Sequence, residues 1–149
     1  MKGRMIRDGL FWVGAIDWHR RLFDSLIPLP DGTSYNAYLI VGKEKTALVD
    51  AVDPSMAEVL FSHLDGVKKI DFIIVQHAEQ DHSGTLPAVL EKYPHAKVLA
   101  TPKGKELLST HLLIPEEKVA AVEDGEALSL GGKTLKFIHT PWFTGRIPW

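Results

Sequence analysis

The chain of 149 residues contains no cysteine. This absence excludes a disulfide framework, a cysteine-ligated zinc site, an iron–sulfur cluster and a rubredoxin-type centre among these residues. Basic residues are not in excess, and a net charge of −2 gives no electrostatic reason to expect nucleic-acid binding. No apolar run reaches membrane-spanning length, and the first residues lack the apolar core of a signal peptide. We therefore expect a cytoplasmic protein that makes no membrane contact.

Hydrophobic residues make up 45% of the chain and charged residues 24%, which is enough to form one globular domain. No glycine-rich phosphate loop is present, and no nucleophilic serine or lysine is indicated. The pattern predicts helices at 56–64, 85–93 and 102–110, and strands at 10–18, 35–41, 46–49, 72–75, 97–100, 118–122, 128–130 and 134–138. Early hairpins followed by alternating strands and helices predict an α/β (α+β) fold with a mixed sheet and flanking helices.

Three local signals support these boundaries. Ser55 and Glu58 form a capping-box pattern at the start of the first helix. The pair Gly131-Gly132 predicts a two-residue hairpin turn. Ser83 and Gly84 are expected to begin the helix that follows the central strand.

The central strand at 72–75 runs directly into a cluster of side chains that can bind metal. His77, Glu79 and Asp81 follow at a spacing of two, so in an extended segment they project to one side. His82 comes next and points elsewhere. The four side chains can thus serve two adjacent metals, His77 with Glu79 and Asp81 with His82. The alternative is a solvated polar loop, but four side chains that can bind metal within six residues, at the exit of a buried strand, favour a metal site for ions such as zinc, iron or manganese.

The motif His77-x-Glu79-x-Asp81-His82 resembles that of the metallo-β-lactamase superfamily, whose common form is His-x-His-x-Asp-His. With glutamate at the second histidine's position, the motif resembles that of the flavodiiron proteins, which reduce dioxygen or nitric oxide at a diiron centre. The segments at 123–125 and 137–142 also resemble that family, and the likeness extends from about residue 10 to residue 142. An anionic oxygen in place of imidazole favours iron over zinc.

The resemblance implies several expectations. The fold would be the first half of a four-layer αββα sandwich. His139, after the strand at 134–138, would complete an iron site with His77 and Glu79. Asp50 and Asp53 flank a strand end that approaches the site in this superfamily, but for Asp53 we prefer a turn or capping role before Pro54. The remaining histidines are expected to be non-ligands, with surface positions for His63 and His95: His19, His63, His95 and His111.

The implied function is reduction of dioxygen to water, of nitric oxide to nitrous oxide, or of both, with electrons from FMN. We expect two irons in the complete domain, an FMN-bearing domain or subunit, an electron donor such as rubredoxin, and a homo-oligomer. The alternatives are a metal-dependent hydrolase of the same fold, in which Glu79 would be unusual, and an inactive fragment.

Residues 1–149 would form a partial diiron domain, because the family's flavodoxin-like FMN domain and later metal ligands are not matched. Residues 143–149 do not resemble the family. One choice of synonymous codons for residues 143–149 encodes a different peptide when the reading frame is shifted by two nucleotides. That peptide is His-Trp-Pro-Asp-Thr-Met, which is similar to the segment with which the family continues. We therefore expect a frameshift in the gene or its record, and a chain that alone binds no FMN.

Overall fold

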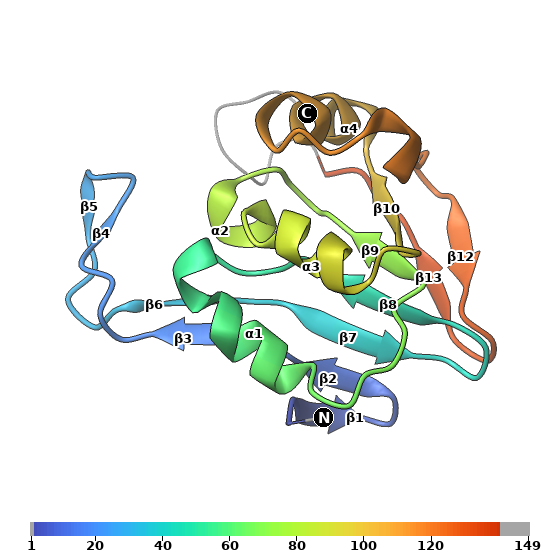
Figure 1. The fold of residues 1–149 in the computed structure, drawn as a ribbon, viewed down its shortest axis with the longest axis horizontal. Coiled ribbons are helices and arrows are strands. Elements are labelled where there is room, and N and C mark those ends of the chain that lie inside the picture. The colour runs from blue at the N-terminus through green and yellow to red at the C-terminus, as the bar shows by residue number, and fades with distance from the viewer. Residues whose placement is uncertain (1, 141–149) are drawn as a thin grey trace.

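The computed structural model describes residues 2–140, in which a mixed sheet carries helices against one face (Figure 1). The sheet has seven strands in the order β1-β2-β7-β8-β9-β10-β11. Its first four strands pair antiparallel, and the pairs from β8 to β11 are parallel. The strand bounds are β1 Arg4–Arg7, β2 Leu10–Trp12, β7 Tyr38–Val41, β8 Thr46–Val49, β9 Phe72–Ile74, β10 Lys97–Ala100 and β11 Val119–Ala121.

Three two-stranded sheets complete the strands of the described residues. They pair β3 (Ala15–Asp17) with β6 (Thr33–Tyr35), β4 (Leu22–Phe23) with β5 (Ile27–Pro28), and β12 (Ala127–Ser129) with β13 (Thr134–Lys136). The helices are η1 Pro54–Met56, α1 Ala57–His63, α2 Gln80–Ser83, α3 Leu86–Lys92, α4 Pro102–His111 and η2 Glu116–Lys118. None of the helices in this part of the chain is long and apolar enough to cross a membrane.

The central strands bury both of their faces. Successive side chains of a strand point to opposite faces, so neighbouring residues belong to two different apolar clusters: Ala47 and Leu48, Ile73 and Ile74, Val98 and Leu99. The larger cluster lies under the helices and includes Leu60 of α1, Val89 of α3 and Leu108 of α4. Figure 1 shows α1 and α3 in front of the sheet. The smaller cluster packs against β12 and β13 through Leu128 and Leu135.

The expected mixed sheet and the helices at 56–64, 85–93 and 102–110 are confirmed to within two residues at each end. So is the hairpin turn, because Gly131 and Gly132 both have positive φ angles (77° and 76°), as a type I′ turn requires. Asp53 is confirmed as a cap: its Oδ1 accepts from the Ser55 amide at 3.0 Å.

Four sequence-based expectations about these elements are wrong. The segment 10–18 is two strands in different sheets, because the chain crosses over at Gly14, where a Cβ would lie 2.1 Å from the Tyr35 carbonyl oxygen. Residues 35–41 are likewise divided between β6 and β7. Ser55 does not cap α1, since Met56 stands at its N-cap with no side-chain bond. Ser83 and Gly84 end the short helix α2 rather than begin α3.

Strands β1, β4 and β5 were not expected. Every residue of β1 is exposed, and β4 and β5 have two residues each, so none carries an apolar alternation. The predicted change of family pattern after residue 142, and the codon argument built on it, lie outside the described residues.

Candidate metal centre

The metal cluster lies at the carboxyl ends of the central parallel strands. β8 and β9 pair in register, Val49 opposite Ile74, so the residues that follow both strands meet at one edge of the sheet. His77 follows β9 and is 9% exposed. We call residues 77–82 the metal loop. The spacing suggested an extended segment, but the second half of the loop is helical. Helix α2 begins at Gln80 and places Asp81 and His82 in its turn.

Hydrogen bonds within the metal loop hold this turn in place. The backbone amide of His82 donates to the Glu79 carbonyl at 3.0 Å. Ser83 is fully buried, and its hydroxyl donates to the carbonyl oxygens of Ala78 and Glu79, each at 3.0 Å. The Ala51 amide donates to the His82 carbonyl at 2.8 Å, which joins the turn to the segment after β8. The loop therefore has a fixed backbone from which its side chains project.

The side chains of the metal loop lie in the pairs that the sequence suggested. His77 Nδ1 is 3.2 Å from Glu79 Oε2, and His82 Nε2 is 3.4 Å from Asp81 Oδ2. The two imidazole rings have their centroids 4.2 Å apart at an interplanar angle of 59°. Two imidazoles and two carboxylates thus occupy one small volume, which is a donor set that iron, zinc and manganese accept.

Asp50 is a member of this cluster that the sequence reasoning did not select. It follows β8 directly, is 3% exposed, and has a positive φ of 56° that is uncommon for a residue with a side chain. Its Oδ1 accepts from the Gln76 amide at 2.8 Å, and its Oδ2 lies 3.7 Å from His82 Nδ1. Donor atoms of Asp50, His77 and His82 all lie within 4.8 Å of one another. A signal was present, because an aspartate at the carboxyl end of a neighbouring parallel strand must reach the same sheet edge.

His139 lies on a different element and is not among the donor groups that meet within 4.8 Å, which are Asp50, His77 and His82. It follows β13, and its backbone amide donates to Asp124 Oδ1 at 2.9 Å. His77 and His139 line the same cavity, of about 740 Å³, whose other walls include Ile74, Leu99 and Phe137. The Nε2 atom of His139 is buried and has no hydrogen-bond partner among residues 2–140. A metal ion would supply that missing partner, so the residues present fit a metal centre.

Burial and neighbouring charge act differently on the two histidines of the loop. Burial lowers the pKa of His77, and the like charge of His82 lowers it further. Burial also opposes a charge on His82, but Asp50 and Asp81 outweigh it and raise the pKa of His82. His77 is therefore ready to donate a lone pair near neutral pH, whereas His82 must lose a proton before one of its ring nitrogens can bind a cation.

The other histidines lie outside this group. His19, His95 and His111 are exposed, as expected for His95. The surface position expected for His63 is wrong. Its Nδ1 is 3.2 Å from the Val13 carbonyl oxygen and 3.0 Å from that of Gly14, so the nitrogen donates to the backbone at the crossover between β2 and β3.

Comparison with known proteins places these features in a family context. The family model described as "Metallo-beta-lactamase superfamily" matches residues 30–144. The chain is 41% identical over 140 residues to "Nitric oxide reductase" of Moorella thermoacetica, covering 91% of this chain and 35% of that protein. It is 37% identical over 144 residues to "Coenzyme F420H(2) oxidase" of Methanocaldococcus jannaschii, covering 91% and 34%.

Among solved structures, the rubredoxin oxygen:oxidoreductase of Desulfovibrio gigas matches with a TM-score of 0.85 and 37% identity. That match covers 91% of this chain and 34% of that one. The chain thus spans about a third of the length of the relatives that it matches. The family model's match at residues 30–144 includes the metal loop.

Proposed function

Since the chain belongs to the metallo-beta-lactamase superfamily, we propose that it is the metal-binding part of a diiron oxidoreductase of flavodiiron type. The reaction is reduction of dioxygen to water or of nitric oxide to nitrous oxide. The names of two relatives, "Nitric oxide reductase" and "Coenzyme F420H(2) oxidase", support this class of reaction. Glu79 is the observation that carries the proposal, because it pairs with His77 in place of the histidine that the superfamily's hydrolases use.

In this proposal the residues of the metal loop divide between two ions. His77, Glu79 and His139 hold one iron, and Asp81 and His82 contribute to the second. When bound, the irons supply electrons to the diatomic substrate. Glu79 and Asp81 give the site carboxylate oxygens, which stabilise oxidised iron more than imidazole does.

The large cavity beside His77 and His139 suits a small apolar substrate. Ile74, Leu99 and Phe137 give it an apolar side, while Gln76, Lys103 and Lys136 are among its polar lining residues. In this proposal the cavity admits O₂ or NO, and the residues at its end hold the metals.

The proposal extends to partners and location. Electrons come from FMN on another domain or subunit, which an electron donor such as rubredoxin reduces. The name of the Desulfovibrio gigas relative, rubredoxin oxygen:oxidoreductase, motivates the choice of rubredoxin. We also propose a homo-oligomer, as the resemblance implies, and a cytoplasmic location, for the reasons given from the sequence.

The test is consumption of O₂ and of NO by the protein loaded anaerobically with ferrous iron, with a chemical reductant in place of FMN. We expect turnover of at least one gas, and loss of most of it in Glu79→Ala. His95→Ala is the matched control, because His95 is exposed and does not line the cavity. Ester or thioester hydrolysis by the zinc-loaded protein, without gas consumption by the iron-loaded one, would instead identify a hydrolase.

A further inference from the structure

A second, smaller cavity borders the metal loop. Its volume is about 140 Å³, and its lining side chains are mostly acidic: Arg20, Phe23, Asp24, Asp53, Glu79, Gln80 and Asp81. Arg20 carries the only positive charge among these lining residues. Two of the acids, Glu79 and Asp81, are the carboxylates that we assign to the metals. A guanidinium therefore shares a confined space with the metal-binding carboxylates.

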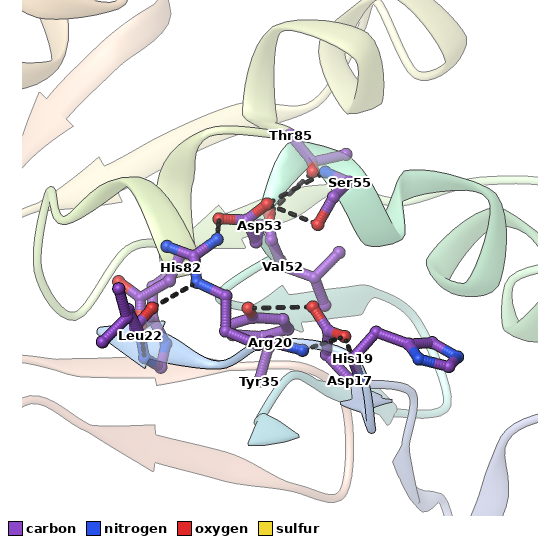
Figure 2. A network of polar contacts seen from close by, with 11 residues as sticks. Asp17, His19, Arg20, Leu22, Tyr35, Val52, Asp53, Ser55, His82 and Thr85 are labelled. Carbon is purple, nitrogen blue, oxygen red and sulfur yellow. Dashed lines mark hydrogen bonds and ion pairs between the residues drawn. The ribbon is translucent and has the colours of Figure 1, made fainter. Parts of the chain in front are cut away.

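The Arg20 side chain is held in place at two points (Figure 2). Its Nε donates to the Leu22 carbonyl oxygen at 2.9 Å, and its Nη1 lies 3.5 Å from Asp53 Oδ2. Its backbone amide donates to Asp17 Oδ1 at 3.0 Å, which fixes the turn that carries it. The positive charge is thus directed toward the cavity by contacts on both its backbone and its side chain.

The two acids that hold Arg20 are themselves fixed. Asp53 is 6% exposed, and its Oδ1 accepts from both the amide and the hydroxyl of Ser55, at 3.0 and 2.7 Å. Asp17 Oδ2 accepts from the Tyr35 hydroxyl at 3.4 Å. Burial and the nearby charge of Asp53 raise the pKa of Tyr35 to about 12, so this hydroxyl remains a donor at ordinary pH. These bonds keep the charge arrangement rigid.

We propose that the Arg20–Asp53 ion pair controls the electrostatic field at the metal loop and so sets how tightly Glu79 and Asp81 hold a divalent cation. The inference rests on the proposed function only in that these two carboxylates are metal ligands. Charges in a partly buried cavity interact more strongly than in bulk water, because the effective dielectric constant is lower. Arg20 and Asp53 nearly cancel each other, so the loss of either one changes the field by one full charge.

If charge controls the site, removing Arg20 and removing Asp53 should change the cation affinity in opposite directions. Arg20→Gln leaves the Asp53 carboxylate unpaired beside the cavity, and cation affinity should rise by about tenfold. Asp53→Asn leaves the guanidinium unpaired, and affinity should fall by about tenfold. Asparagine can still accept from the Ser55 amide, so the turn before α1 keeps its cap. The double variant should return close to the affinity of the unaltered protein.

The experiment is calorimetric titration of the metal-free protein with Zn²⁺, which needs no redox chemistry. Arg20→Lys should retain the original affinity, because it keeps the charge. Arg21→Gln is the matched control: Arg21 is exposed, donates to the Pro30 carbonyl oxygen and does not line the cavity. High salt should shrink the differences between variants, because ions screen the field.

The outcomes separate this inference from the function on which it rests. A merely structural role for the ion pair predicts weaker binding in both single variants and no rescue by lysine, and that result would overturn the inference alone. Unchanged affinity in Arg20→Gln would overturn it as well. Failure of the unaltered protein to bind Zn²⁺ would overturn the proposed metal site together with the inference.

Discussion

Replacement of Asp50 separates the roles of its backbone, its hydrogen bond and its charge. Asp50→Ala removes the Oδ1 atom that accepts from the Gln76 amide at 2.8 Å. We expect the loss of this hydrogen bond to lower the free energy of unfolding by about 1 kcal/mol. Alanine must also adopt the φ of 56°, at a cost of about 1–2 kcal/mol relative to a residue that tolerates it. We therefore expect the free energy of unfolding of the metal-free protein to fall by about 2–3 kcal/mol.

Asp50→Asn is the matched variant. Asparagine accepts from the same amide and tolerates positive φ, so the loss at alkaline pH should stay below about 1 kcal/mol. At acidic pH the loss should grow. The folded protein raises the pKa of His82 above 6.5, so the associated stability is fully present below that pH and disappears as pH rises through the folded pKa. The asparagine side chain lacks the charge that produces much of this effect.

The assay is urea denaturation in the presence of a chelator, at several pH values between about 5 and 9, which span the titration of histidine. Zn²⁺ titration of the same proteins adds a second readout. Asp50→Asn should weaken cation binding by roughly tenfold to a hundredfold, because an outer carboxylate orients the histidine ring that binds. Equal losses of stability in the two variants at every pH, or unaltered cation binding in Asp50→Asn, would refute the assigned roles.

Three further predictions concern the fold and the site. Thr101→Ala should lower stability by about 1 kcal/mol, measured by urea denaturation, because the Thr101 hydroxyl caps α4 by accepting from the Gly104 amide at 3.0 Å. Leu108→Ala should cost about 2–5 kcal/mol in the same assay, since Leu108 is fully buried, whereas the exposed Leu113→Ala should cost little. Zn²⁺ affinity should rise with pH until His82 has lost its proton. Calorimetry in buffers of different ionisation enthalpy should detect the proton that is released on binding. An affinity that does not change with pH, with no proton release, would contradict the raised pKa of His82.

Local sequence was sufficient where the chemistry is local. His77 and Glu79 could be paired because they are close in the chain, and the same holds for Asp81 and His82. The Gly131-Gly132 turn was predictable because only residues that tolerate positive φ fit a type I′ hairpin. Central strands were predictable because residues such as Ile73 and Ile74 supply an apolar run that is buried on both faces.

The errors arise where distant segments decide the structure. Asp50 joins the cluster through the parallel register of β8 and β9, which depends on pairing and not on local pattern. The strand at 10–18 divides because Gly14 approaches the Tyr35 backbone. His63 is bonded at that same crossover, so its surface assignment failed for the same reason. Arg20 gave no sequence signal, since its importance comes from a cavity shared with the metal loop.

The central claim is that the metal loop binds iron. The most direct measurement is a crystal of the iron-loaded protein examined by anomalous diffraction at the iron edge. We predict a peak within about 2.0–2.2 Å of donor atoms of His77 and Glu79, the usual length of metal bonds to nitrogen and oxygen. Iron content should fall strongly in His77→Ala and Glu79→Ala and stay unchanged in His95→Ala. No anomalous peak at the loop, or equal iron content in all three variants, would contradict the account.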